Sequence, residues 1–192
     1  MTELDCQWMA RTLKQYDMLL FPCKGAEENE PGVSPGATPG RTAAELQNMV
    51  DYANAGGRIF ATHFSYVWLD RKAPFSGTAN WNVNQAYPSP DPQTGYIVTS
   101  FPKGQALADW LQYIGASTTN GQITVNTLRK DFNTLVAPSQ EWMELHGPKV
   151  ILHYTFNTPV GSPADQQCGR VLFDDFHVEN HGYINQNSAY NM

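Results

Sequence analysis

Three side chains that can take part in catalysis or metal binding each follow a stretch predicted to be a β-strand. They are Cys23 after residues 18–22, His63 after residues 58–62, and His177 after residues 170–176. In an open parallel sheet, ligands bind beyond the carboxyl ends of the strands. We therefore expect Cys23, His63 and His177 to converge at one edge of a sheet, provided that the last strand is also parallel.

His177 and Glu179 are two residues apart, so on a strand their side chains share a face. A carboxylate that accepts the imidazole N–H fixes the tautomer of the ring and raises its basicity. This pair predicts His177 as a general base oriented by Glu179, with Cys23 as nucleophile and Lys24 favouring its thiolate. Alternatively, His177 ends a core strand and Cys23 is buried or disulfide-bonded.

A metal site is the second chemical interpretation. His63 and His177 could bind a divalent ion such as zinc, because imidazole and carboxylate ligands together suit it. The carboxylates near them in the predicted fold are Glu27, Glu28, Asp175 and Glu179. Asp174 and Asp175 could instead bind calcium. The alternatives are that the His63 ring packs under the segment 70–102 and that the two aspartates are solvated or paired.

Aromatic side chains gather after the second predicted strand. They lie just before and within residues 70–102, a region rich in Pro, Gly and Asn. The candidates for substrate binding are Tyr66, Trp68, Trp81 and Tyr87. Flat rings can stack on sugars or contact an acyl chain. Alternatively, they form the core of a long surface excursion over residues 70–102.

Helical and strand patterns alternate along the chain. Residues 18–22 and 58–62 read as strands joined by a helix with a capping box, Thr42 and Glu45, and a Gly56-Gly57 stop. Such a unit places both strands parallel. We expect an α/β fold, a mostly parallel sheet flanked by helices, in one domain over residues 1–192. Because such sheets usually open with a strand, an N-terminal strand is expected to be missing.

The composition and charge of the chain exclude several classes of partner. The 192 residues are 41% hydrophobic and 16% charged, with a net charge of −6 and no apolar run long enough for a bilayer. This pattern argues against disorder, a membrane span and a nucleic-acid partner. The low charge suits an extracellular or cell-surface protein if the start is truncated, and a cytoplasmic one otherwise. The three cysteines cannot all pair within one chain.

Three segments, YDMLLFPCKG, YANAGGRIFATHFSYVWL and CGRVLFDDFHVEN, resemble the class I glutamine-amidotransferase-like, flavodoxin-like fold, in particular its trehalose-utilisation (ThuA-like) branch. The resemblance implies that His177-Val178-Glu179 matches the family's His-x-Glu pair. It also places the family's nucleophile elbow at Thr62-His63-Phe64, where this chain has no cysteine. Glutamine hydrolysis by the family's usual route is therefore not expected.

Together these patterns predict a small-molecule hydrolase acting on an ester, lactone, amide or glycosidic bond. His177 and Glu179 would do the acid–base work, and Cys23 or a metal-bound water at His63 would supply the nucleophile. The alternative is a non-catalytic ligand- or carbohydrate-binding domain of a larger secreted bacterial protein. The partner in both cases is a small molecule or a carbohydrate.

Overall fold

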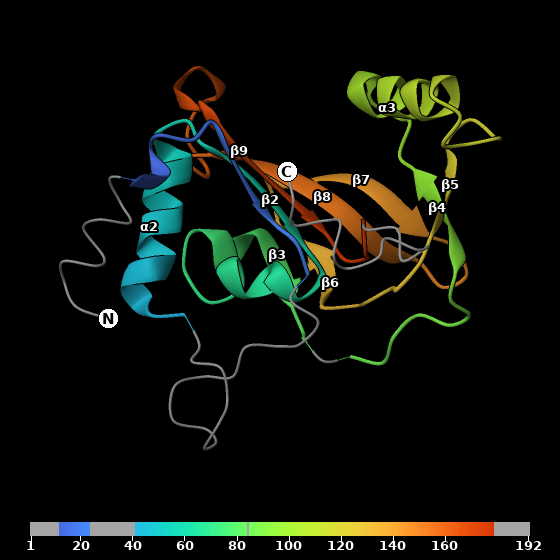
Figure 1. The fold of residues 1–192 in the computed structure, drawn as a ribbon, viewed down its shortest axis with the longest axis horizontal. Coiled ribbons are helices and arrows are strands. Elements are labelled where there is room, and N and C mark those ends of the chain that lie inside the picture. Colours follow the sequence, from blue (N-terminus) through green and yellow to red (C-terminus); the bar gives the residue numbers. More distant parts are fainter. Residues whose placement is uncertain (1–11, 24–40, 84, 179–192) are drawn as a thin grey trace, which may run out of the picture.

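The computed structural model describes residues 12–23, 41–83 and 85–178 (Figure 1). Its main feature is one mixed sheet of seven strands. In spatial order these are β1 (Met18–Phe21), β2 (Arg58–Thr62), β9 (Gly169–Asp174), β8 (Val150–Thr158), β7 (Gln140–Leu145), β4 (Gln93–Ile97) and β5 (Gln122–Val125). The sheet curls into a half-barrel.

Smaller elements complete the fold. A second sheet pairs β3 (Ala79–Trp81) with β6 (Phe132–Leu135) in antiparallel fashion. The helices are α2 (Ala43–Asn54), α3 (Pro102–Tyr113) and the 3-10 turns η1 (His63–Trp68), η2 (Phe75–Thr78) and η3 (Ala164–Gln166). Figure 1 shows α2 beside β1, β2 and β9, and α3 near the opposite end of the sheet, over β4 and β5.

The strand–helix–strand unit predicted from the sequence is confirmed. β1 pairs with β2 in parallel, and β2 pairs with β9 in parallel. The capping box that starts α2 is also present. The backbone N–H of Glu45 donates to Thr42 Oγ1 at 3.2 Å, and the backbone N–H of Thr42 donates to Glu45 Oε2 at 2.7 Å.

The predicted fold class, a mostly parallel sheet flanked by helices, is wrong. Beyond β9, the pairs β9–β8, β8–β7, β7–β4 and β4–β5 are all antiparallel. Four residues, 146–149, join β7 to β8, and ten residues, 159–168, join β8 to β9. Connections this short favour hairpins, because a parallel crossover needs a dozen or more residues. The sheet therefore does not have the amidotransferase-like, ThuA-like architecture that the sequence led us to expect.

The segment 70–102 is more than a surface excursion. It contributes β3 to the second sheet and β4 to the main sheet, where β4 lies between β7 and β5. The local pattern of Pro, Gly and Asn concealed these strands, because β4 is only five residues long and includes a glycine.

Two clusters of buried side chains form the core. The larger joins α2, η1 and the inner strands, and includes Val50, Tyr66 and Phe173. The smaller lies between α3 and the antiparallel strands, and includes Ala108 and Leu152. β8 contributes to both clusters, so it is buried along most of its length. No helix in the described ranges is both long and apolar enough to cross a membrane.

We predict that Gly169→Ala strongly destabilises the protein. A Cβ at Gly169, the first residue of β9, would overlap the carbonyl oxygen of Ala53 in α2 and Oγ1 of Thr158. Thr158 Oγ1 already donates to that carbonyl at 2.7 Å, so neither partner can move freely. Overpacking of this kind costs about 1–3 kcal/mol or more. The free energy of unfolding from denaturant titration measures the loss.

Gly77→Ala is the matched control, because a Cβ at Gly77 meets no atom within 4 Å and its φ is not positive. Its free energy of unfolding should stay within about 0.5 kcal/mol of the wild type. Equal losses in the two variants would contradict the close approach of α2 to β9.

Candidate metal centre

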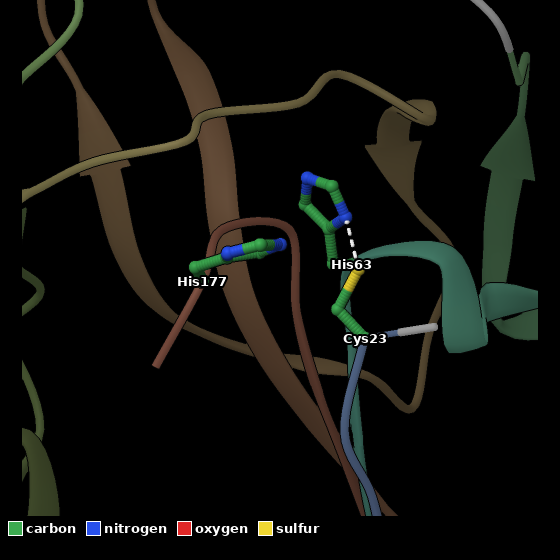
Figure 2. A group of neighbouring side chains, drawn as sticks. All are labelled: Cys23, His63 and His177. Atoms are coloured by element: carbon green, nitrogen blue, oxygen red, sulfur yellow. Dashed lines mark hydrogen bonds between the residues drawn. The ribbon is translucent and has the colours of Figure 1, made fainter. Parts of the chain in front are cut away.

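Cys23, His63 and His177 lie together at the carboxyl ends of the three parallel strands β1, β2 and β9 (Figure 2). Cys23 Sγ is 2.8 Å from Nδ1 of His63. One ligand atom from each of the three residues lies within 4.8 Å of the others. His63 is buried, and the other two side chains are half-buried. The structure thus brings together all three residues that the strand pattern singled out.

His63 occupies the turn between β2 and η1 in an uncommon backbone conformation. Its φ is 52°, in the left-handed region that side chains other than glycine seldom adopt. Histidine enters this region several-fold more often than most residues, yet the conformation still carries strain. The turn directs the imidazole back over the strand ends, where its ring centroid lies 4.1 Å from that of His177.

Cys23 is held by contacts made just before it. Ser65 in η1 donates its hydroxyl hydrogen to the carbonyl oxygen of Pro22 at 2.9 Å. One residue earlier, the Phe21 ring packs against Trp68, with ring centroids 5.1 Å apart. The same short 3-10 turn that begins at His63 therefore also fixes the chain leading to the thiol.

His177 is held through the backbone of residues 126–131. Its N–H donates to the carbonyl oxygen of Asn126 at 3.4 Å. Nearby, the Arg129 N–H donates to the carbonyl oxygen of Asp175 at 2.9 Å, and the Asp131 N–H donates to Asp175 Oδ2 at 2.8 Å. The end of β9 and this loop thus form one hydrogen-bonded unit.

A buried guanidinium adjoins the centre, and no local sequence pattern points to it. Arg129 is 1% exposed and forms a two-bond ion pair with Asp131, at 2.5 and 2.7 Å. Its third contact is the hydroxyl of Tyr87, at 3.0 Å. The guanidinium carbon also lies 4.0 Å from the ring centroid of Phe64, the residue after His63. The ion pair therefore supports the turn that carries His63.

Burial and positive charge keep His63 neutral. Desolvation, followed by the charges of His177 and Arg129, lowers the pKa of His63 from 6.5 to about 3. A neutral imidazole is the form that binds metal ions. At the end of β9, burial and then the nearby Asp131 carboxylate raise the pKa of Asp175 well above its ordinary value.

The aromatic residues predicted to bind substrate are mostly part of the core. Tyr66 and Trp68 are 0% and 6% exposed, and Trp81 is half-buried, with its ring 5.7 Å from Phe173. Tyr87 is 61% exposed, and its hydroxyl meets Arg129. Three of the four rings therefore stabilise the fold and do not form an exposed stacking platform.

The predicted carboxylate partners are not part of the described group. Glu27, Glu28 and Glu179 lie outside the described residues, so the His177–Glu179 pair stays a prediction. Asp174 contacts His153, with its Oδ1 2.7 Å from Nδ1, and Asp175 accepts from the backbone of Asp131. Both aspartates thus have protein partners, and calcium binding there is not supported.

The described cysteines are not disulfide-bonded. They are Cys23 and Cys168, and neither is joined by a disulfide to another described residue. Cys168 directly precedes β9, at the opposite end of that strand from His177. The two described cysteines are therefore not paired with each other, and Cys6 lies outside the described residues.

The low pKa of His63 predicts a pH dependence of stability in the metal-free protein. Between pH 6.5 and about 3, His63 is neutral in the folded chain but protonated in the unfolded one. The unfolded state therefore binds more protons, so stability falls as the pH falls, by up to about 1.4 kcal/mol per pH unit. His63→Asn is the control variant, because the asparagine side chain does not titrate and because asparagine tolerates a positive φ.

Urea unfolding of chelator-treated wild type and His63→Asn at several pH values between 4 and 7 measures the difference in slope. The wild-type curve should be the steeper of the two. Parallel curves would show that the environment of His63 does not depress its pKa.

Comparisons with known proteins identify a shared fold and no family. No family model matches the chain, and no curated protein matches it. The fold is similar to that of the cytoplasmic protein STM3548 from Salmonella typhimurium, with a TM-score of 0.54 and 9% identity, over 92% of this chain and 67% of that one. The N-terminal domain of mmIFT52 has a TM-score of 0.47 and 11% identity, over 87% of this chain and 68% of that one. At 9% identity, the first similarity concerns the fold alone.

Proposed function

We propose that Cys23, His63 and His177 together bind one divalent transition-metal ion, and that zinc is the ion they suit best. The observation that carries this proposal is the position of the three ligand atoms within 4.8 Å of one another. Thiolate sulfur and imidazole nitrogen are both common zinc ligands. Calcium prefers six to eight oxygen ligands, so the same group disfavours it.

The geometry needs little adjustment to accept the ion. In a tetrahedral zinc site, neighbouring sulfur and nitrogen ligands are about 3.3–3.6 Å apart, given metal–ligand bonds of about 2.0–2.3 Å. The Sγ–Nδ1 distance of 2.8 Å between Cys23 and His63 is shorter than this. Metal binding would replace the proton in that contact and separate the two atoms slightly.

Among the described residues, three can bind the ion, which leaves a fourth tetrahedral position. A structural zinc site is closed by four protein ligands, whereas a site with three holds water or substrate in the fourth position. A zinc ion bound by Cys23, His63 and His177 would therefore be open to a small molecule. Such an ion can lower the pKa of bound water and polarise a carbonyl oxygen.

The catalytic roles expected from the sequence go beyond this proposal. Hydrolysis of an ester, lactone, amide or glycosidic bond stays a prediction, because its orienting residue, Glu179, lies outside the described residues. The alternative of a non-catalytic ligand- or carbohydrate-binding domain also stays a prediction. The Cys23–His63 contact would also suit a thiol nucleophile with its base. Metal binding distinguishes these uses, since a coordinated thiolate is protected from alkylation.

Zinc titration against a chromophoric chelator tests the proposal. We expect the wild type to bind one equivalent tightly. Cys23→Ser and His177→Ala should each weaken binding by more than about 100-fold, because even the loss of an outer hydrogen-bonding partner of a ligand costs 10–100-fold. Zinc should also slow alkylation of Cys23 by iodoacetamide.

Cys168→Ser and His146→Ala are the matched controls, because both residues are exposed and lie outside the three-residue group. Their zinc affinity should equal that of the wild type. Loss of affinity in these controls, or its retention in Cys23→Ser and His177→Ala, would place the ion elsewhere.

A further inference from the structure

A cavity of about 680 Å³ lies between α3 and the main sheet, and His177 is one of its lining residues. This volume falls within the range of small-molecule sites, about 300–1,000 Å³. Its walls are mainly apolar side chains from α3, β5, β7 and the end of β9. They include Leu107, Leu111, Ile123, Val125, Met143 and Phe176. The cavity can therefore accept an apolar molecular body.

One polar pair interrupts the apolar wall. His153 on β8 and Asp174 on β9 are direct cross-strand partners, and both line the cavity. His153 Nδ1 lies 2.7 Å from Asp174 Oδ1, and the two side chains are 12% and 4% exposed. The other polar residues of the lining include Thr124 and Asn126, which are exposed. His177, which belongs to the proposed metal centre, also lines the cavity, so the His153–Asp174 pair is the buried polar feature of the cavity outside that centre.

The chemistry of this pair favours a particular head group. Because Asp174 occupies Nδ1 of His153, Nε2 is the ring atom left to meet a ligand. With a neutral imidazole the pair carries one negative charge, and with a protonated imidazole it carries none. An anionic head group would therefore add negative charge that nothing in the pair compensates. A neutral hydroxyl group can donate to Nε2 or accept from it without this penalty.

We propose that the cavity binds a small, mostly apolar molecule that carries a hydroxyl group, with the hydroxyl at His153 and the apolar body between α3 and the sheet. This site goes beyond the proposed metal centre, since its polar contact is the His153–Asp174 pair. His153 determines the preferred head group, Asp174 positions the imidazole, and Leu111 and Ile123 hold the body.

The probes 2-naphthol, 2-methylnaphthalene and 2-naphthoate share one apolar body and differ in the head group. Fluorescence titration of the zinc-loaded, full-length protein should show that 2-naphthol binds about tenfold more tightly than 2-methylnaphthalene, as one hydrogen bond contributes. In His153→Phe this preference should vanish while 2-methylnaphthalene still binds. Leu111→Trp, which fills the cavity, should weaken both ligands by more than about tenfold.

Tyr113→Trp is the matched control for Leu111→Trp, because it also places a tryptophan on α3 but at a position that is 89% exposed and outside the cavity lining. The affinity of this variant for each probe should match that of the wild type. Tighter binding of 2-naphthoate or of 2-(aminomethyl)naphthalene than of 2-naphthol would overturn the assignment of the head group. The site itself would be refuted if Leu111→Trp left binding unchanged. If 2-naphthol binding required zinc and survived His153→Phe, the head group would meet the ion rather than His153, and the proposal would be wrong.

Discussion

Parallel pairing of β2 with β1 on one side and β9 on the other is the constraint on which the candidate site depends. Parallel strands end at the same edge, so the residues that follow them must meet there. Cys23, His63 and His177 are far apart in the chain and adjacent in space for this reason. A shift in either pairing would separate the thiol from the imidazoles. The close contact between Gly169 and α2 helps to fix the position of β9 relative to that helix.

The fold holds the three side chains in place with groups that are themselves buried. His63 has a positive φ and little exposure, so surrounding contacts must offset the strain of its turn. One of these contacts is made by the Arg129–Asp131 ion pair, which packs against Phe64. A buried ion pair contributes little net stability once desolvation is counted, but removing one partner is expensive. Its value here lies in fixing the position of His63.

Part of this arrangement follows from local sequence patterns, and part does not. The apolar runs at 18–22 and 58–62, with the capping box between them, predict two parallel strands and so the proximity of Cys23 and His63. In the antiparallel half of the sheet, β4 pairs with β7, which is distant in the chain, and no local pattern encodes that pairing. Gly147-Pro148 between two strand-like runs is a turn signal that favours the β7–β8 hairpin. The burial of Arg129 and the His153–Asp174 contact arise only from tertiary packing.

X-ray absorption spectroscopy at the zinc edge of the zinc-loaded protein tests the central claim most directly, because it identifies the atoms bound to the ion. Coordination by Cys23, His63 and His177 predicts one sulfur at about 2.3 Å and two imidazole nitrogens at about 2.0–2.1 Å. A shell with no sulfur, or with two or more, would contradict a single ion held by these three residues.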